Sequence, residues 1–249
     1  MIRKITTIAI LFGASVFANA QDNTKNLEDG FVFLQNPRPS TEFSINNKIV
    51  DVKKGDILNA NGFAVKLPKN ETLGIALSNG IGIIIEGPAD FRIDNLKQTY
   101  PILPLISNTY ADSISNTKIS INSGSFYIAS LKKNFSSSIT INAKGVNIKS
   151  KNSKLVVRAS KDVDIYSLEG SCEAKFGNGI TEVLRDGNKI STISKGKLGK
   201  SEHIFSIMIK RLSKKMNKAM AIVQSVNFLS TPDNKATVRI LLDETRLLR

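Results

Sequence analysis

Apolar and polar residues alternate with a period of two through the middle of the chain. Six pairs of apolar residues follow this pattern: Ile119 and Ile121, Phe126 and Ile128, Ile139 and Ile141, Val146 and Ile148, Leu155 and Val157, and Val163 and Ile165. Ser, Asn, Lys and Asp occupy the positions on the opposite face. Successive side chains of a strand point to opposite faces of a sheet, so the pattern predicts strands with one buried and one solvated face.

Shorter strand-like runs precede this region and are separated by Pro, Asn or Gly. They are Ala64 to Leu67, Thr72 to Leu77, Ile81 to Glu86 and Ala89 to Ile93. Ser78-Asn79-Gly80 has the residue types of a primed two-residue turn, so Thr72 to Glu86 is predicted to be a hairpin. The segment Asn95 to Ser115 contains Pro101 and Pro104 among scattered apolar residues, and we expect a surface excursion there.

The period changes near Ser201. From Glu202 to Val226 an apolar stripe recurs at steps of three and four, which predicts one amphipathic helix. The stripe consists of Ile204, Ile207, Met208, Leu212, Met216, Met220 and Val223. We expect Ser201 to cap this helix, Glu202 to lie in its first turn, and its lysines to face water. Ala236 to Leu242 is typical of a last strand.

These patterns predict a mainly β protein, an antiparallel sandwich, roll or short β-solenoid with one C-terminal amphipathic α-helix. The predicted organisation is a signal peptide over 1–20, a lead-in with the first strands over 21–47, a β domain over 48–196, and the helix and final strand over 197–249.

The predicted signal peptide combines a cationic start, an apolar run and a cleavage site. Arg3 and Lys4 precede the run from Ile5 to Phe17, and Ala18-Asn19-Ala20 matches the A-x-A pattern. The mature chain should therefore begin at Gln21 and be periplasmic or secreted. An uncleaved N-terminal anchor is the alternative, although the apolar run is short for a bilayer.

Positive charge is concentrated near the predicted helix. The chain has a formal net charge of +14, and residues 195–218 alone carry eight Lys or Arg against one Glu. Lys210, Arg211, Lys214, Lys215 and Lys218 are the candidate partner-binding residues. An envelope protein, an anionic polymer or a membrane surface would be attracted to them, whereas export argues against nucleic acid. A solvated basic face that serves solubility is the alternative interpretation.

Residues that could perform catalysis or bind a metal are few. Cys172 and His203 are the one cysteine and the one histidine, too few for a zinc site, and no phosphate-binding loop occurs. Glu86, Asp90, Glu169 and Glu173 are the candidate acids for general acid and base chemistry, but predicted exposed turns explain them. We expect no enzymatic activity and no cofactor.

Several motifs, in order, resemble the FecR domain, the periplasmic sensor domain of iron-dicitrate-type transmembrane signalling proteins. They are Lys54 to Leu58, Ser78 to Gly80, Glu86 to Ile93, Ile119 to Ile128 around Gly124, Val163 to Ser171, and Ile190 to Gly196. Gly55, Gly80, Gly87, Pro88, Gly124 and Gly170 are expected to be structural, at turns or sharp bends. The Gly-Thr pair usual in such domains has no match in Val146 to Ala159.

The resemblance implies a fold and an envelope setting more than a signalling role, because the cytoplasmic region and membrane helix of FecR regulators are not recognised here. The leading hypothesis is an exported, non-enzymatic FecR-like binding or regulatory module. One alternative is an envelope assembly protein that uses its basic helix to contact anionic partners or membrane surface. A carbohydrate-active enzyme is the second alternative.

Overall fold

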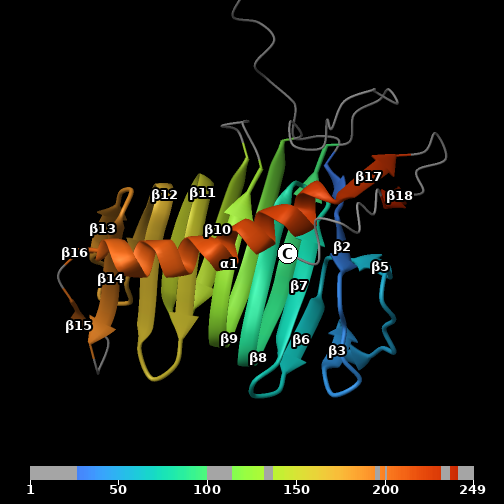
Figure 1. Ribbon diagram of the computed structural model, residues 1–249, viewed down its shortest axis with the longest axis horizontal. Helices are drawn as coiled ribbons and strands as arrows, with labels where there is room; N and C mark the ends of the chain where they lie inside the picture. Colours follow the sequence, from blue (N-terminus) through green and yellow to red (C-terminus); the bar gives the residue numbers. More distant parts are fainter. Residues whose placement is uncertain are drawn as a thin grey trace, which may run out of the picture.

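The computed structural model of the chain describes residues 27–99, 114–131, 137–193, 197–199, 201–230 and 236–240 (Figure 1). The strands before residue 100 are β1 (Glu28–Asp29), β2 (Phe31–Leu34), β3 (Glu42–Ile45), β4 (Lys48–Ile49), β5 (Ile57–Asn59), β6 (Phe63–Leu67), β7 (Thr72–Leu77) and β8 (Ile81–Gln98). Those after it are β9 (Ser115–Ser130), β10 (Ser138–Ala143), β11 (Val146–Ala159), β12 (Val163–Lys175), β13 (Thr181–Leu184), β14 (Asn188–Ile193), β15 (Lys197–Leu198), β16 (Glu202–His203), β17 (Val226–Ser230) and β18 (Ala236–Ile240).

One helix, α1 (Ser206–Gln224), accompanies these strands in the described part of the chain. This confirms the prediction of a mainly β protein with one helix near its C-terminus. The predicted signal peptide and the predicted new N-terminus at Gln21 lie outside the described residues. Of the helical residues described, no stretch is both long and apolar enough to cross a membrane.

Sixteen strands of the described chain pair in one large mixed sheet, which folds over on itself. The long strands β8, β9, β11 and β12 bend in their middle, where the pairing register shifts or a glycine has positive φ. The two ends of one strand therefore approach each other. Across β11, Lys144 Nζ donates a hydrogen bond to the carbonyl oxygen of Ser160. At the ends of β8, Ser78 Oγ donates to Gln98 Oε1 over 2.9 Å.

The folded sheet has two layers. The helix-bearing layer comprises β2, β7 and β14 with residues 81–86 of β8, 124–130 of β9, 154–159 of β11 and 163–167 of β12. The outer layer comprises β3, β4, β6, β10 and β13 with residues 90–98 of β8, 115–121 of β9, 146–151 of β11 and 172–175 of β12.

A single apolar core fills the space between the layers. Phe91 of the outer layer stacks on Phe126 of the helix-bearing layer, with ring centroids 5.6 Å apart. The apolar residues of the alternating pairs are buried, as the alternation indicated, among them Ile121, Phe126, Ile128, Ile139, Ile141, Val157, Val163 and Ile165.

Three details of the sheet differ from the predictions. Ile81 to Glu86 and Ala89 to Ile93 are one strand, because Gly87-Pro88 forms an irregularity within β8 and not a turn. Pro88 lies where the register shifts, so its missing N–H removes no ladder bond. Asn95 to Gln98 continue this strand, and the rest of the predicted surface excursion lies largely outside the described residues. β10 pairs in parallel with β9, so the sheet is not wholly antiparallel.

The predicted hairpin from Thr72 to Glu86 is confirmed, but its turn is not of the primed type. Gly80 has a φ of +81°, whereas Asn79 has no positive φ. The Gly80 N–H donates to the carbonyl oxygen of Leu77, and residues 78–80 form a three-residue hairpin loop. Asn79 is buried, and its side-chain amide donates hydrogen bonds to the hydroxyls of Ser115 and Thr117 in the other layer.

Helix α1 is shorter than its apolar pattern predicted. Glu202 and His203 form β16, which pairs with β14, so Ser201 is not the N-cap and Glu202 is not in the first turn. Phe205 holds the N-cap position without a side-chain hydrogen bond. At the other end, Val226 already belongs to β17, which pairs with β18 in a separate two-stranded sheet.

Candidate functional site

Helix α1 runs across the strands of the helix-bearing layer, over β7, β8 and β9 (Figure 1). Its buried residues are Leu212, Met216, Ala219, Ile222 and Val223, and Met208 and Met220 pack partly against the same cluster. They meet Phe33, Ile84 and Tyr127 of the sheet. The apolar stripe of the helix thus packs on the chain's own sheet, except that Ile207 points away and is 81% exposed.

Two glycines of the sheet make room for the helix. A Cβ at Gly82 would overlap the backbone carbonyl of Ala219, and a Cβ at Gly74 would meet the Ile222 side chain. Neither position stands out in the sequence, because each lies in an apolar strand and nothing local marks the approach of a helix. The pair fixes how closely α1 lies on the layer.

Lys215 joins the helix to the sheet by polar contacts with Glu86 and Tyr127. Its Nζ donates to Glu86 Oε1 over 2.5 Å and to Tyr127 Oη over 3.3 Å, and Tyr127 Oη donates to Glu86 Oε2 over 3.0 Å. Burial lowers the pKa of Lys215, but its bonds to Glu86 and Tyr127 outweigh that effect and raise it above the usual value. Lys215 therefore stays charged and serves the fold, contrary to the prediction that all helical lysines face water.

The other four predicted cations form one exposed surface, which we call the basic face of α1. It consists of Lys210, Arg211, Lys214 and Lys218. None of them makes an ion pair with a described residue, and α1 contains no Asp or Glu. Phe205 and Ile207 extend this face at the start of the helix, 77% and 81% exposed.

The acids considered for catalysis do not form one cluster. Each of them either has a polar partner within the fold or is exposed to solvent. Glu86 pairs with Lys215, Asp90 accepts from Asn122 over 3.2 Å, and Glu169 pairs with Lys154. Glu86, Asp90 and Glu169 lie inside strands, so their predicted placement in turns is wrong. Glu173 is exposed on β12. No three His, Cys, Asp or Glu side chains gather as a metal site among the residues described.

Cys172 is buried in β12, and burial raises the pKa of its thiol to about 12. It is therefore neutral at physiological pH. His203 is exposed on β16.

The glycines expected at turns or bends divide into two groups. Gly55 and Gly80 lie in turns between strands, with φ of +90° and +81°. Gly124 and Gly170 also have positive φ but lie within β9 and β12, where those strands bend. Gly87 lies within β8 with Pro88, and a Cβ there would overlap the carbonyl oxygen of Pro68.

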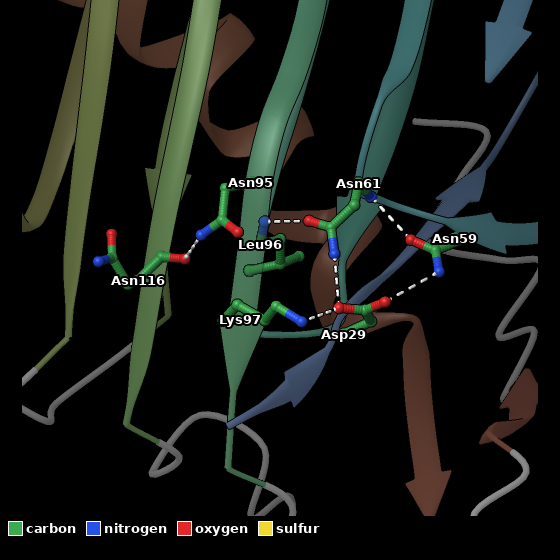
Figure 2. A network of polar contacts seen from close by, with 7 residues as sticks. All are labelled: Asp29, Asn59, Asn61, Asn95, Leu96, Lys97 and Asn116. Carbon is green, nitrogen blue, oxygen red and sulfur yellow. Dashed lines mark hydrogen bonds and ion pairs between the residues drawn. The ribbon is translucent and has the colours of Figure 1, made fainter. Parts of the chain in front are cut away.

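A network of polar contacts lies where β1 pairs with the C-terminal end of β8 (Figure 2). Asp29 accepts from Lys97 Nζ and, over 2.7 Å, from Asn61 Nδ2, while Asn61 Oδ1 accepts from the Leu96 N–H over 2.6 Å. The hydrogen bond from Lys97 is the main reason that the pKa of Asp29 lies below its usual value. The ammonium group of Lys97 is engaged by Asp29, so it is not free to bind a partner.

No protein-family model and no curated protein matches the chain. Among solved structures, it is similar to two from Parabacteroides distasonis ATCC 8503, each described as a "putative anti-sigma factor". One is 12% identical over 68% of this chain and 69% of that chain, with a TM-score of 0.42. The other is 9% identical over 74% and 87%, with a TM-score of 0.43. At this similarity, neither comparison assigns a family or a function.

Proposed function

We propose that the chain is a FecR-like, non-enzymatic binding or regulatory module of the bacterial cell envelope, and that the basic face of α1 binds its partner. The observation that carries this proposal is a row of cations that make no ion pair with any described residue. Lys210, Lys214 and Lys218 follow each other at steps of four, so they lie along one ridge of the helix.

Such a row is unfavourable in the free protein. Like charges four residues apart in a helix destabilise it by about 0.2–0.5 kcal/mol per pair. No acidic residue of α1 offsets this repulsion. An acidic partner surface relieves it on binding, and complementary charge also speeds association.

A protein partner suits this surface better than a bilayer. The apolar side of α1 is already buried against the sheet, so it is not available for insertion among lipids. Phe205 and Ile207 remain exposed beside the cations. A few apolar contacts next to charged ones are typical of a protein–protein interface.

The envelope setting rests on the signal-peptide pattern of residues 1–20. N-terminal sequencing of the chain recovered from an exporting host should begin at Gln21. Recovery of an intact Met1, or of an N-terminus that stays embedded in the membrane, would remove this part of the proposal.

The partner surface is tested with the triple variant K210E/K214E/K218E, immobilised and exposed to envelope extract. The wild-type chain should retain an acidic protein that salt releases, and the variant should lose it. K53E/K54E/K69E makes the same change of charge at exposed lysines elsewhere and should retain it. Equal loss by both variants would contradict the proposal. The proposal would also be contradicted if the wild type bound vesicles of phosphatidylglycerol and phosphatidylethanolamine in a salt-sensitive way and K210E/K214E/K218E did not.

A further inference from the structure

The solvent-facing side of the outer layer carries a broad polar hollow of about 720 Å³, separate from α1. It lies over β9, β10, β11 and β12. Hydroxyl and amide side chains make up much of its lining: Asn116, Ser138, Thr140, Asn147 and Ser171. Lys118, Lys149 and Lys151 line it too, Glu173 is the one acid among the described lining residues, and Val183 lies at the β13 side.

The register of the strands arranges these groups in rows. Lys118 is paired with Thr140, Thr140 with Lys149, and Lys149 with Glu173. Neighbouring strands lie about 4.8 Å apart, so the backbones at Lys118 and Lys149 are roughly 10 Å apart. Lys151 stands two residues further along β11, on the same side of the layer.

The three lysines are free to bind a ligand. The side-chain ammonium groups of Lys118, Lys149 and Lys151 make no hydrogen bond or ion pair within the part of the chain that the structure describes. Lys149 is not paired even with Glu173, its neighbour across the ladder. With three cations and one acid, the described lining residues carry a net positive charge.

A second hollow on the same layer, of about 430 Å³, shows the opposite arrangement. Both of its described cations have carboxylate partners: Lys66 pairs with Glu42 over 2.9 Å, and Arg92 pairs with Asp94, which is not part of the lining, over 2.6 Å. The two hollows therefore differ in whether the cations that line them have carboxylate partners.

We propose that the first hollow binds an acidic glycan, a sugar chain that carries carboxylates. Lysine ammonium groups would pair with the carboxylates, and the Asn, Ser and Thr side chains would hydrogen-bond sugar hydroxyls. No aromatic residue is among the described residues that line the hollow, so these residues offer no ring for stacking on a neutral sugar. A protein partner would need a larger apolar centre than Val183 offers.

Binding of polygalacturonate, a carboxylated glycan, tests this proposal by titration at fixed ionic strength. We expect it to bind more tightly than polyglutamate of equal charge, which has no hydroxyls, and we expect neutral dextran not to bind. K118Q/K149Q should weaken binding by about tenfold or more, since it removes two charge-assisted contacts. K53Q/K69Q, which removes two exposed lysines outside the hollow, should leave binding unchanged.

Three results would overturn the proposal: equal affinity for polyglutamate, equal weakening by both variants, or displacement of the polymer by low concentrations of inorganic phosphate. Thermal melts of the variants ensure that a loss of binding is not a loss of fold. The basic face of α1 is unchanged in K118Q/K149Q, so the glycan site and the proposed function can fail separately.

Discussion

Gly82 shows how a single residue sets the position of helix α1 on the sheet. The carbonyl of Ala219 lies so close to Gly82 that no other residue fits without movement. The contact is to backbone, so no rotation of a side chain can relieve it. Whatever α1 does as a binding surface depends on this close approach.

Replacing Gly82 by Ala should therefore destabilise the protein. Overpacking of this kind costs about 1–3 kcal/mol. Chemical denaturation measures the loss, and Gly177→Ala is the matched control, since nothing lies within 4 Å of a Cβ there. Equal stability of the two variants would show that α1 is not held against β8 as described.

Asp29 should make a pH-dependent contribution to stability (Figure 2). Its folded pKa is lowered, chiefly by Lys97, so the contribution is present above the unfolded pKa of about 3.9 and is lost as pH falls through the folded value. The free energy of unfolding of the wild type should exceed that of Asp29→Asn at neutral pH. The difference should shrink below about pH 4. A difference that stays constant from neutral pH to strong acid would contradict this role.

At the scale of elements, α1 is expected to be part of the core and not a detachable arm. Leu212 is 2% exposed. Leu212→Asp should cost at least about 2–5 kcal/mol, because it removes a packed side chain and buries a charge. Ile207→Asp, on the exposed side, should change the melting temperature little. An unchanged melting temperature for Leu212→Asp, with salt-sensitive binding to anionic vesicles, would favour membrane contact instead.

The elements were predicted best where the pattern is regular and local. The alternation from Ile119 to Ile165 identified the strands and their buried faces, and the stripe from Met208 to Val223 identified the helix. Boundaries failed where pairing partners decide them. Glu202 could belong to a helix by its own preference, but pairing with Lys189 of β14 makes it a strand residue. Likewise, β8 continues past Gly87-Pro88 because its residues before and after this pair are bonded to neighbouring strands.

In the whole molecule, the two layers share one apolar core. Ile141 of the outer layer and Ile165 of the helix-bearing layer are both fully buried in it. Replacing either by Ala should lower the free energy of unfolding by about 2–5 kcal/mol. Each variant should unfold in one transition, and Ile49→Ala, at an exposed position, should change little. Unchanged denaturation midpoints for both core variants would contradict the shared core.

The two candidate sites differed in how far the sequence could predict them. The basic face of α1 depends on steps of four within one helix, which a sequence shows directly. Lys215 was the exception, because its partners Glu86 and Tyr127 are distant in the chain. The hollow of the outer layer depends on register between β9, β10 and β11, and the parallel pairing of β10 with β9 has no local signal.

Photocross-linking in an exporting host can detect the proposed contact between the basic face of α1 and a partner protein. A photoreactive residue at position 214 should give one discrete protein adduct. The same residue at position 69, also an exposed lysine in the wild type, should give none, and adding K210E and K218E should suppress the adduct at 214. No adduct at position 214, or the same adduct at both positions, would contradict the claim.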